Sequence, residues 1–168
     1  MPGKIRIGIV GATVTQGGSG WGANAHIPAL RAQADYEVVA VCTAHEDTAK
    51  ASAEAFGVSK AYHDINAMAA DPDVDLVVVS VRVPWHRDLV MAALQAGKPV
   101  FCEWPLGANL AEAEEMRDLA HAQGVITQID LQSRGGPQLN QMRDLIADGY
   151  VGRVTSVTMH TSGGGGGV

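Results

Sequence analysis

The feature that most restricts the fold is a series of short, almost unbroken apolar runs separated by segments with helical signals. The clearest run is Leu-Val-Val-Val-Ser-Val at residues 76–81. Runs of Val, Ile and Leu without polar alternation are typical of parallel strands that are covered on both faces. Strands of this kind are predicted at residues 4–10, 37–42, 76–81, 99–102 and 125–129.

Helical segments alternate with these runs. Helices are predicted at residues 23–30, 47–56, 86–96 and 109–121, and from the Gly135-Gly136-Pro137 turn to about residue 148. Glycines follow most of them, as expected at helix ends, and Asn109 with Glu112 has the pattern of a capping box. Strands and helices that alternate with short connections predict an α/β fold, a doubly wound parallel sheet with helices on both faces. A ligand is then expected outside the carboxyl ends of the strands.

The first strand leads into a lengthened turn, GATVTQGGSGWG, before the next helix. The usual dinucleotide-binding spacing places glycines at positions 11, 13 and 16, where this chain has Gly11, Thr13 and Gln16. Backbone N–H groups and the helix dipole at such a turn favour a pyrophosphate. Pyrophosphate contacts are therefore predicted from Gly11, Ala12, Thr13 and Thr15, with threonine hydroxyls replacing lost backbone contacts. The alternative is a long loop that binds nothing.

The end of the second predicted strand bears on the choice of cofactor. An acidic residue there binds the ribose 2′-hydroxyl of NAD, and its absence beside a basic residue suits the 2′-phosphate of NADP. This chain has Thr43 and His45 in that stretch and no arginine. The cofactor is predicted to be NADP or NAD, with NADP favoured and with Thr43 and His45 at the adenosine ribose. The alternative is that Thr43-Ala44-His45 is only a turn.

Two further stretches follow strands and should line the same cleft. Ser80, Val81, Val83 and His86 are predicted in its middle. Glu103 and Trp104 are predicted at its nicotinamide end, and they are the nearest candidates for catalytic residues. His86 could instead pack locally at a helix start, and Trp104 could pack against another domain. The histidines are scattered, so no Ser/His/Asp triad and no metal cluster is predicted.

Composition argues against several classes of main partner. The chain has 168 residues, 46% of them hydrophobic and 18% charged, with a net charge of −6, which argues against nucleic acid or an anionic membrane as a partner. No apolar run approaches the roughly 20 residues that span a bilayer. The N-terminus leads directly into a strand, so no signal peptide is predicted. Two cysteines are too few for a disulfide framework, and a cytoplasmic location is expected.

The last part of the chain differs from the rest. Residues 153–160 alternate like a half-exposed strand and lead into a run of glycines. We therefore expect a dinucleotide-binding domain at residues 1–130, and at residues 131–168 a helix and the first strand of a truncated second domain. The alternative is a flexible end or linker.

Several segments resemble the glucose–fructose oxidoreductase/inositol dehydrogenase (Gfo/Idh/MocA) family: KIRIGIVGA, HIPAL, AALQAGKPVFCEWPL and LIADGYVGRVTSV. The resemblance implies a Rossmann domain followed by an α/β domain that carries much of the substrate site and the dimer interface. The full-length protein is then expected to be a homo-oligomer.

The chain departs from this family at two motifs. The family's Glu-Lys-Pro motif, whose lysine supports hydride transfer, is Glu103-Trp104-Pro105 here, and its Thr-Pro-Asn is Val81-Arg82-Val83. Both departures occur in the branch that resembles the fungal galactose-regulon repressor. The resemblance thus implies either NAD(P)-dependent oxidation of a sugar or polyol, or a non-catalytic NAD(P) sensor. We expect the 168-residue chain alone to bind cofactor without turnover.

Overall fold

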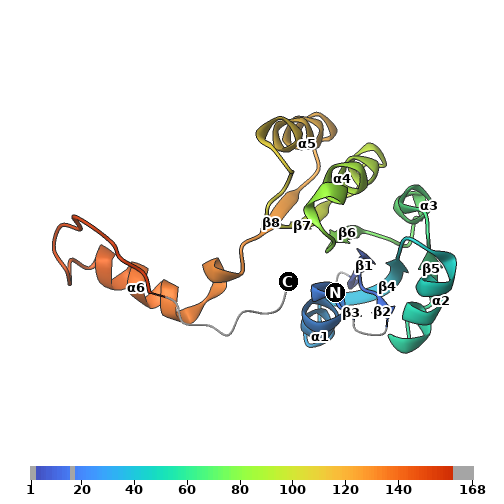
Figure 1. Ribbon diagram of the computed structural model, residues 1–168, viewed down its shortest axis with the longest axis horizontal. Helices are drawn as coiled ribbons and strands as arrows, with labels where there is room; N and C mark the ends of the chain where they lie inside the picture. Colours follow the sequence, from blue (N-terminus) through green and yellow to red (C-terminus); the bar gives the residue numbers. More distant parts are fainter. Residues whose placement is uncertain (1–2, 16–17, 161–168) are drawn as a thin grey trace. The chain divides into compact units, whose positions relative to one another are not determined.

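The structure, a computed structural model, describes residues 3–15 and 18–160 (Figure 1). Its main element is a six-stranded sheet in which every neighbouring pair is parallel, in the order β5-β4-β1-β6-β7-β8. The strands are β1 (Ile5–Val10), β4 (Tyr36–Cys42), β5 (Lys60–Tyr62), β6 (Leu76–Val79), β7 (Val100–Glu103) and β8 (Thr127–Asp130). The order reverses between β1 and β6, which is where an open α/β sheet binds its ligands. The predicted doubly wound parallel sheet is confirmed.

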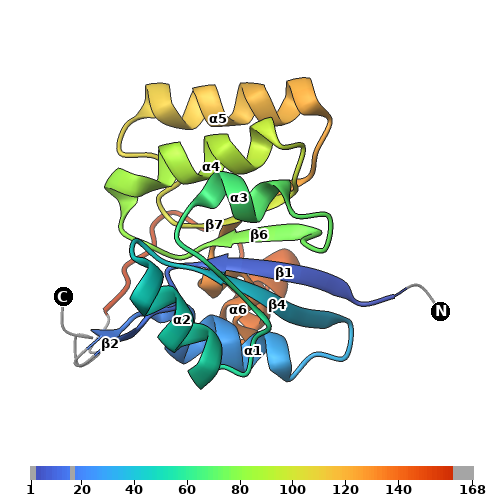
Figure 2. The ribbon, with the colours of Figure 1, turned by 90° about the vertical axis from the view of Figure 1, so that its right-hand side faces the viewer.

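Helices cover both faces of this sheet (Figure 2). One face carries α3 (Ile65–Ala70), α4 (His86–Gln95) and α5 (Leu110–Gln123), and the other carries α1 (Ile27–Arg31) and α2 (Glu46–Ala55). Alternate residues of each strand point to opposite faces. Val77 and Val79 therefore pack on the side of α3, α4 and α5, and Val78 packs on the side of α1 and α2. This two-sided burial explains why the strands have continuous apolar sequences.

The capping box predicted at the start of α5 is confirmed. The Asn109 side chain accepts a hydrogen bond from the backbone N–H of Glu112, and the Glu112 carboxylate accepts one from the backbone N–H of Ala108. The helix ends at Gly124, which has the left-handed backbone conformation (φ 65°) that favours glycine there.

Several elements were not predicted. Strand β5 is a three-residue edge strand without an apolar run, and α3 is only six residues long. The lengthened turn contains a small hairpin, β2 (Val14–Thr15) with β3 (Gly18–Ser19), which forms a separate antiparallel sheet. Because such short elements bury few side chains, they leave little periodic signal in the sequence.

Residues 131–160 belong to a second compact unit, which begins at Leu131. It contains a short 3₁₀ helix, Gln132–Gly135, and α6 (Pro137–Ala147). The strand predicted at residues 153–160 is not formed: these residues are exposed and have no regular secondary structure. A strand needs a neighbour for its backbone hydrogen bonds, and in the described residues this segment pairs with none. None of the helices in residues 3–15 and 18–160 is long and apolar enough to cross a membrane.

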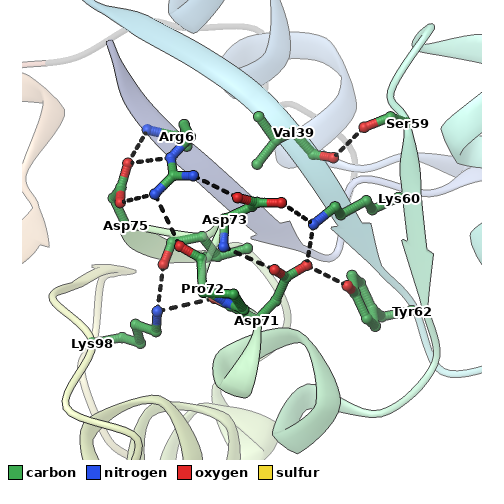
Figure 3. Close-up of polar contacts among 11 residues, drawn as sticks. Arg6, Val39, Ser59, Lys60, Tyr62, Asp71, Pro72, Asp73, Asp75 and Lys98 are labelled. Carbon is green, nitrogen blue, oxygen red and sulfur yellow. Dashed lines mark hydrogen bonds and ion pairs between the residues drawn. The ribbon is translucent and has the colours of Figure 1, made fainter. Parts of the chain in front are cut away.

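A network of charged side chains ties together segments at the amino end of the sheet (Figure 3). The Arg6 guanidinium on β1 donates two hydrogen bonds to the Asp75 carboxylate, at 2.9 and 2.8 Å. Lys60 donates to Asp71 at 2.6 Å and to Asp73 at 2.7 Å. The Tyr62 hydroxyl also donates to Asp71. The network therefore joins β1, β5 and the loop before β6, at the end of the sheet opposite to where a ligand is expected.

These contacts lower the pKa of two carboxyl groups. Hydrogen bonds from Lys60 hold the pKa of Asp71 well below its usual range, and those from Arg6 lower the pKa of Asp75 to about 2. A carboxyl whose pKa is lower in the folded state stabilises the fold above its unfolded-state pKa of about 4. That contribution is lost as the pH falls through the lower, folded-state pKa.

We therefore predict that Asp71→Asn lowers the free energy of unfolding at pH 7 by about 2 kcal/mol, because a carboxylate with 8% exposure loses charged hydrogen bonds. Urea denaturation at pH 7 and pH 3 measures the effect, and the difference between variant and wild type should shrink at pH 3. Asp88→Asn, at a side chain 75% exposed, is the control and should have little effect. Equal losses for the two variants would contradict the assignment.

Candidate functional site

A cleft of about 430 Å³ lies at the carboxyl ends of β1, β6 and β7, at the reversal of strand order. It brings together six of the residues predicted from the sequence, and it adds Gly20, Trp21 and Arg82. The lining residues are Gly11, Thr13, Gly20, Trp21, Ser80, Val81, Arg82, Glu103 and Trp104.

Gly11 packs closely against Ser80, the residue that follows β6. Its φ is +94°, and a Cβ atom there would lie 2.0 Å from the Ser80 carbonyl oxygen. Only glycine fits, for both conformational and steric reasons. The absence of a side chain leaves the backbone of the turn open to the cleft.

The lengthened turn keeps a second close-packing glycine, although not at a position of the usual spacing. A Cβ atom at Gly22 would lie 3.1 Å from the Cα and the N atom of Ala12. Gly22 begins the π-helical segment Gly22–His26 that leads into α1, so it lets the helix start pack against the first turn. This is the role of the third glycine in the usual spacing, displaced by the insertion. Gln16, where that glycine was sought, lies outside the described residues.

The inserted hairpin is held against α2. The backbone N–H of Val14 donates to the Ser52 hydroxyl at 3.1 Å, and Ser52 is fully buried. The first part of the insertion is thus anchored to the body of the domain. Thr15 belongs to β2, but its side chain, and with it the predicted hydroxyl contact, lies outside what the structure describes.

Ser80 places a polar atom without a partner at the cleft. Its residue is 6% exposed, and its hydroxyl is the one buried side-chain N or O atom of the described residues that has no hydrogen-bond partner. A buried hydroxyl without a partner costs free energy, so such atoms call for an explanation. Ser80 also lines the cleft, so this hydroxyl lies beside the space where a ligand is expected.

Arg82 supplies a positive charge to the cleft, although it was not among the predicted cofactor contacts. It is exposed, lines the cleft and forms no ion pair with the residues that the structure describes. Its neighbours Ser80 and Val81 were predicted from their place after a strand, and the same reasoning applied to Arg82. Trp21 and Trp104, 51% and 63% exposed, add two aromatic side chains to the lining.

Behind Glu103 lies a polar group that was not predicted. Nε2 of His26 is 2.5 Å from Oε1 of Glu103 and 3.9 Å from Oδ2 of Asp130. The strands align Glu103 with Asp130 as direct neighbours on β7 and β8. These residues are far apart in the sequence, and they come together because the carboxyl ends of parallel strands lie at the same end of the sheet. Spacing along the chain does not reveal such a contact.

His86 does not line the cleft, which corrects one prediction. It is fully buried, with Nδ1 2.9 Å from the Pro105 carbonyl oxygen and Nε2 2.9 Å from the Val81 carbonyl oxygen. Both ring nitrogens therefore face backbone carbonyl oxygens, and the neutral imidazole can donate a hydrogen bond to one of the two. His86 connects the loop after β6 with the loop after β7, and it holds in place two segments that line the cleft.

The remaining predicted residues lie away from the lining. The buried Thr43 donates its hydroxyl to the His45 carbonyl oxygen at 2.9 Å, and it lies 2.6 Å from the Thr48 hydroxyl. His45 is exposed just before α2. Ala12 is fully buried, and Val83 begins a 3₁₀ turn.

Neither cysteine is suited to nucleophilic chemistry. Burial raises the pKa of both the Cys42 and the Cys102 thiol to about 12, so almost no thiolate exists at neutral pH. The lining of the cleft offers backbone, hydroxyl, guanidinium, carboxylate and aromatic groups. These groups can bind an extended ligand that carries both anionic and planar parts.

The comparisons with known proteins agree with this description. A family model described as an oxidoreductase family with an NAD-binding Rossmann fold, GFO_IDH_MocA, matches residues 5–131. Dehydrogenase aclE of Aspergillus oryzae is 40% identical over 126 residues, which cover 74% of this chain and 34% of the relative. The galactose/lactose metabolism regulatory protein GAL80 of Saccharomyces cerevisiae is 29% identical over 95% of this chain and 38% of its own length.

A solved structure has a similar fold. A mutant of KijD10, a 3-ketoreductase from Actinomadura kijaniata in complex with TDP-benzene and NADP, is 28% identical with a TM-score of 0.79. The match covers 90% of this chain and 46% of that one. The chain thus spans less than half the length of these relatives.

Proposed function

The chain belongs to the Gfo/Idh/MocA oxidoreductase family, and from this membership we propose that its cleft binds NAD(P) for hydride transfer to or from a sugar or polyol. The observation that supports the proposal most directly is the buried Ser80 hydroxyl without a partner, beside the close approach of Gly11. An orphan hydroxyl and an open glycine backbone at the reversal of strand order fit a dinucleotide.

Each part of the cofactor is assigned to residues along the cleft. The backbone of Gly11 and Ala12, with Thr13, Thr15 and the cation of Arg82, holds the pyrophosphate. Thr43 and His45 lie at the adenosine end, where His45 favours NADP. Ser80, Val81 and Val83 line the middle, and Glu103 and Trp104 lie at the nicotinamide end. KijD10, with NADP in its structure, is a relative of the same fold.

The dinucleotide supplies the hydride chemistry, and the protein supplies position and electrostatics. Trp104 stands where the family's motif has lysine, and an indole cannot exchange a proton at neutral pH. Glu103, hydrogen-bonded to His26, is the titratable carboxyl that lines the cleft. Among the described residues that line the cleft, Glu103 is therefore the candidate to accept a proton from the substrate.

Calorimetric titration with NADP and with NAD tests the binding. The wild type should bind, and Thr13→Asp should weaken binding at least tenfold, because it places a carboxylate in the cleft beside the pyrophosphate. Thr127→Asp is the matched control, since it introduces the same charge at an exposed residue at the opposite end of the sheet. The ratio of NADP to NAD affinity tests the role proposed for His45. Equal affinities of wild type and Thr13→Asp would refute the placement of the pyrophosphate.

A second candidate function is regulation by NAD(P) binding without turnover. Two observations favour it: Trp104 replaces the motif lysine, and GAL80, which is named a regulatory protein, resembles nearly the whole chain. An assay of NAD(P)H absorbance with the full-length protein and a panel of sugars and polyols distinguishes the two functions. Turnover would identify an oxidoreductase, whereas tight binding without turnover of any member of the panel would favour the regulatory function.

A further inference from the structure

His26, Glu103 and Asp130 form the only group of three or more His, Cys, Asp or Glu side chains, among the described residues, whose ligand atoms converge. One ligand atom from each lies within 4.8 Å of the other two. The three come from separate elements: the helical segment before α1, the end of β7 and the end of β8. The sheet fixes the two carboxylates as direct neighbours through the register Glu103↔Asp130.

The charge of this group is unbalanced. The Glu103 and Asp130 side chains are each 15% exposed, and His26 is 12% exposed. Within the described residues, no lysine or arginine lies within ion-pair distance of either carboxylate, and His26 is their only basic neighbour. Two largely buried carboxylates with one imidazole leave an excess of negative charge, which is costly away from water.

We propose that His26, Glu103 and Asp130 bind a divalent cation, and that the ligand set suits Zn²⁺. One imidazole nitrogen and two carboxylate oxygens match zinc, whereas Mg²⁺ and Ca²⁺ prefer oxygen ligands alone. Three protein ligands leave a fourth position for water, as in zinc sites that are not purely structural.

The observed distances allow this coordination with small movements. Zinc bonds of about 2.0–2.2 Å in tetrahedral geometry separate ligand atoms by about 3.4 Å. The His26–Glu103 distance of 2.5 Å must open by about 0.9 Å, and the His26–Asp130 distance of 3.9 Å must close by about 0.5 Å. Side-chain rotation supplies shifts of this size without moving the strands.

The site lies next to the cleft, because Glu103 belongs to both. The inference does not depend on the proposed function, since Zn²⁺ alone is the probe and no dinucleotide is needed. Failure of dinucleotide binding and failure of zinc binding are therefore separate results.

The experiment is calorimetric titration of the 168-residue chain with ZnCl₂ in a buffer without chelating components. The wild type should bind one Zn²⁺ per chain. Asp130→Asn and His26→Gln, which change different elements, should each weaken binding at least tenfold. Thermal melting provides the second measurement: Zn²⁺ should raise the Tm of the wild type more than that of either variant, because a ligand of the native state stabilises it.

The matched controls are His121→Gln and Asp118→Asn, a histidine and an aspartate that are exposed on α5. Both should bind Zn²⁺ like the wild type. Circular dichroism verifies that Asp130→Asn and His26→Gln fold. If one variant is unfolded, the Zn²⁺ affinity of the other variant tests the proposal. Wild-type affinity weaker than millimolar would overturn the proposal. So would unchanged affinity in a folded Asp130→Asn or His26→Gln variant.

Discussion

Gly11→Ala is expected to lower the free energy of unfolding by about 4 kcal/mol and to abolish dinucleotide binding. Two effects add at this position. A φ of +94° is unfavourable for any residue with a Cβ atom, and that atom would lie 2.0 Å from the Ser80 carbonyl oxygen. Because Ser80 directly follows the central strand β6, neither the turn nor the sheet can yield without disturbing the other.

Gly97→Ala separates the two effects. Gly97 also has a positive φ, of +69°, but a Cβ atom there meets nothing within 4 Å. This control should cost about 1 kcal/mol, from backbone strain alone. Urea denaturation of both variants measures the difference, and titration with NADP follows the loss of binding. Similar stability losses at the two glycines would show that the contact with Ser80 is unimportant.

His86→Ala is expected to lower the free energy of unfolding by about 3 kcal/mol and to weaken dinucleotide binding. The substitution leaves a cavity at a fully buried position and removes the ring that lies between the Val81 and Pro105 carbonyl oxygens, with a hydrogen bond to one of them. Those carbonyls belong to the two loops that carry Arg82 and Trp104 into the cleft. Loss of the connection should therefore lower affinity although His86 itself does not line the cleft.

Urea denaturation and calorimetry of His86→Ala test this role, with His121→Ala on the exposed surface of α5 as the control. The control should change neither stability nor affinity by a measurable amount. A stable His86→Ala variant with wild-type affinity would contradict a positioning role.

The sheet could be predicted from the sequence because burial on both faces makes each central strand continuously apolar. β6 is the clearest example, since Val77, Val78 and Val79 are all buried although they point to alternate faces. The carboxyl ends of these strands then identify Ser80 and Glu103 as candidates for the site. Strand β5 lacks this signal because it lies at the edge of the sheet, and its Lys60 and Tyr62 belong to the polar network instead.

The parts of the site that could not be predicted depend on contacts between residues that lie far apart in the sequence. Gly22 performs its packing role only because the insertion displaces the helix start, which a fixed glycine spacing does not anticipate. His26 and Asp130 meet Glu103 through the order of the strands and the path of the chain into α1. His86 was placed in the cleft because it begins a helix after a strand, whereas its ring turns inward to the backbone of the loops.

The hairpin in the first turn has a consequence for how the length of this loop can vary. β2 and β3 bond to each other as a sheet of their own, and Val14 joins them to the body through Ser52. None of these bonds enters the six-stranded sheet, whose register is set by β1 and its neighbours. Doubling the length of a flexible loop costs only about 0.6 kcal/mol in closure entropy. Insertions and deletions here can therefore change one wall of the cleft while the core of the sheet stays the same.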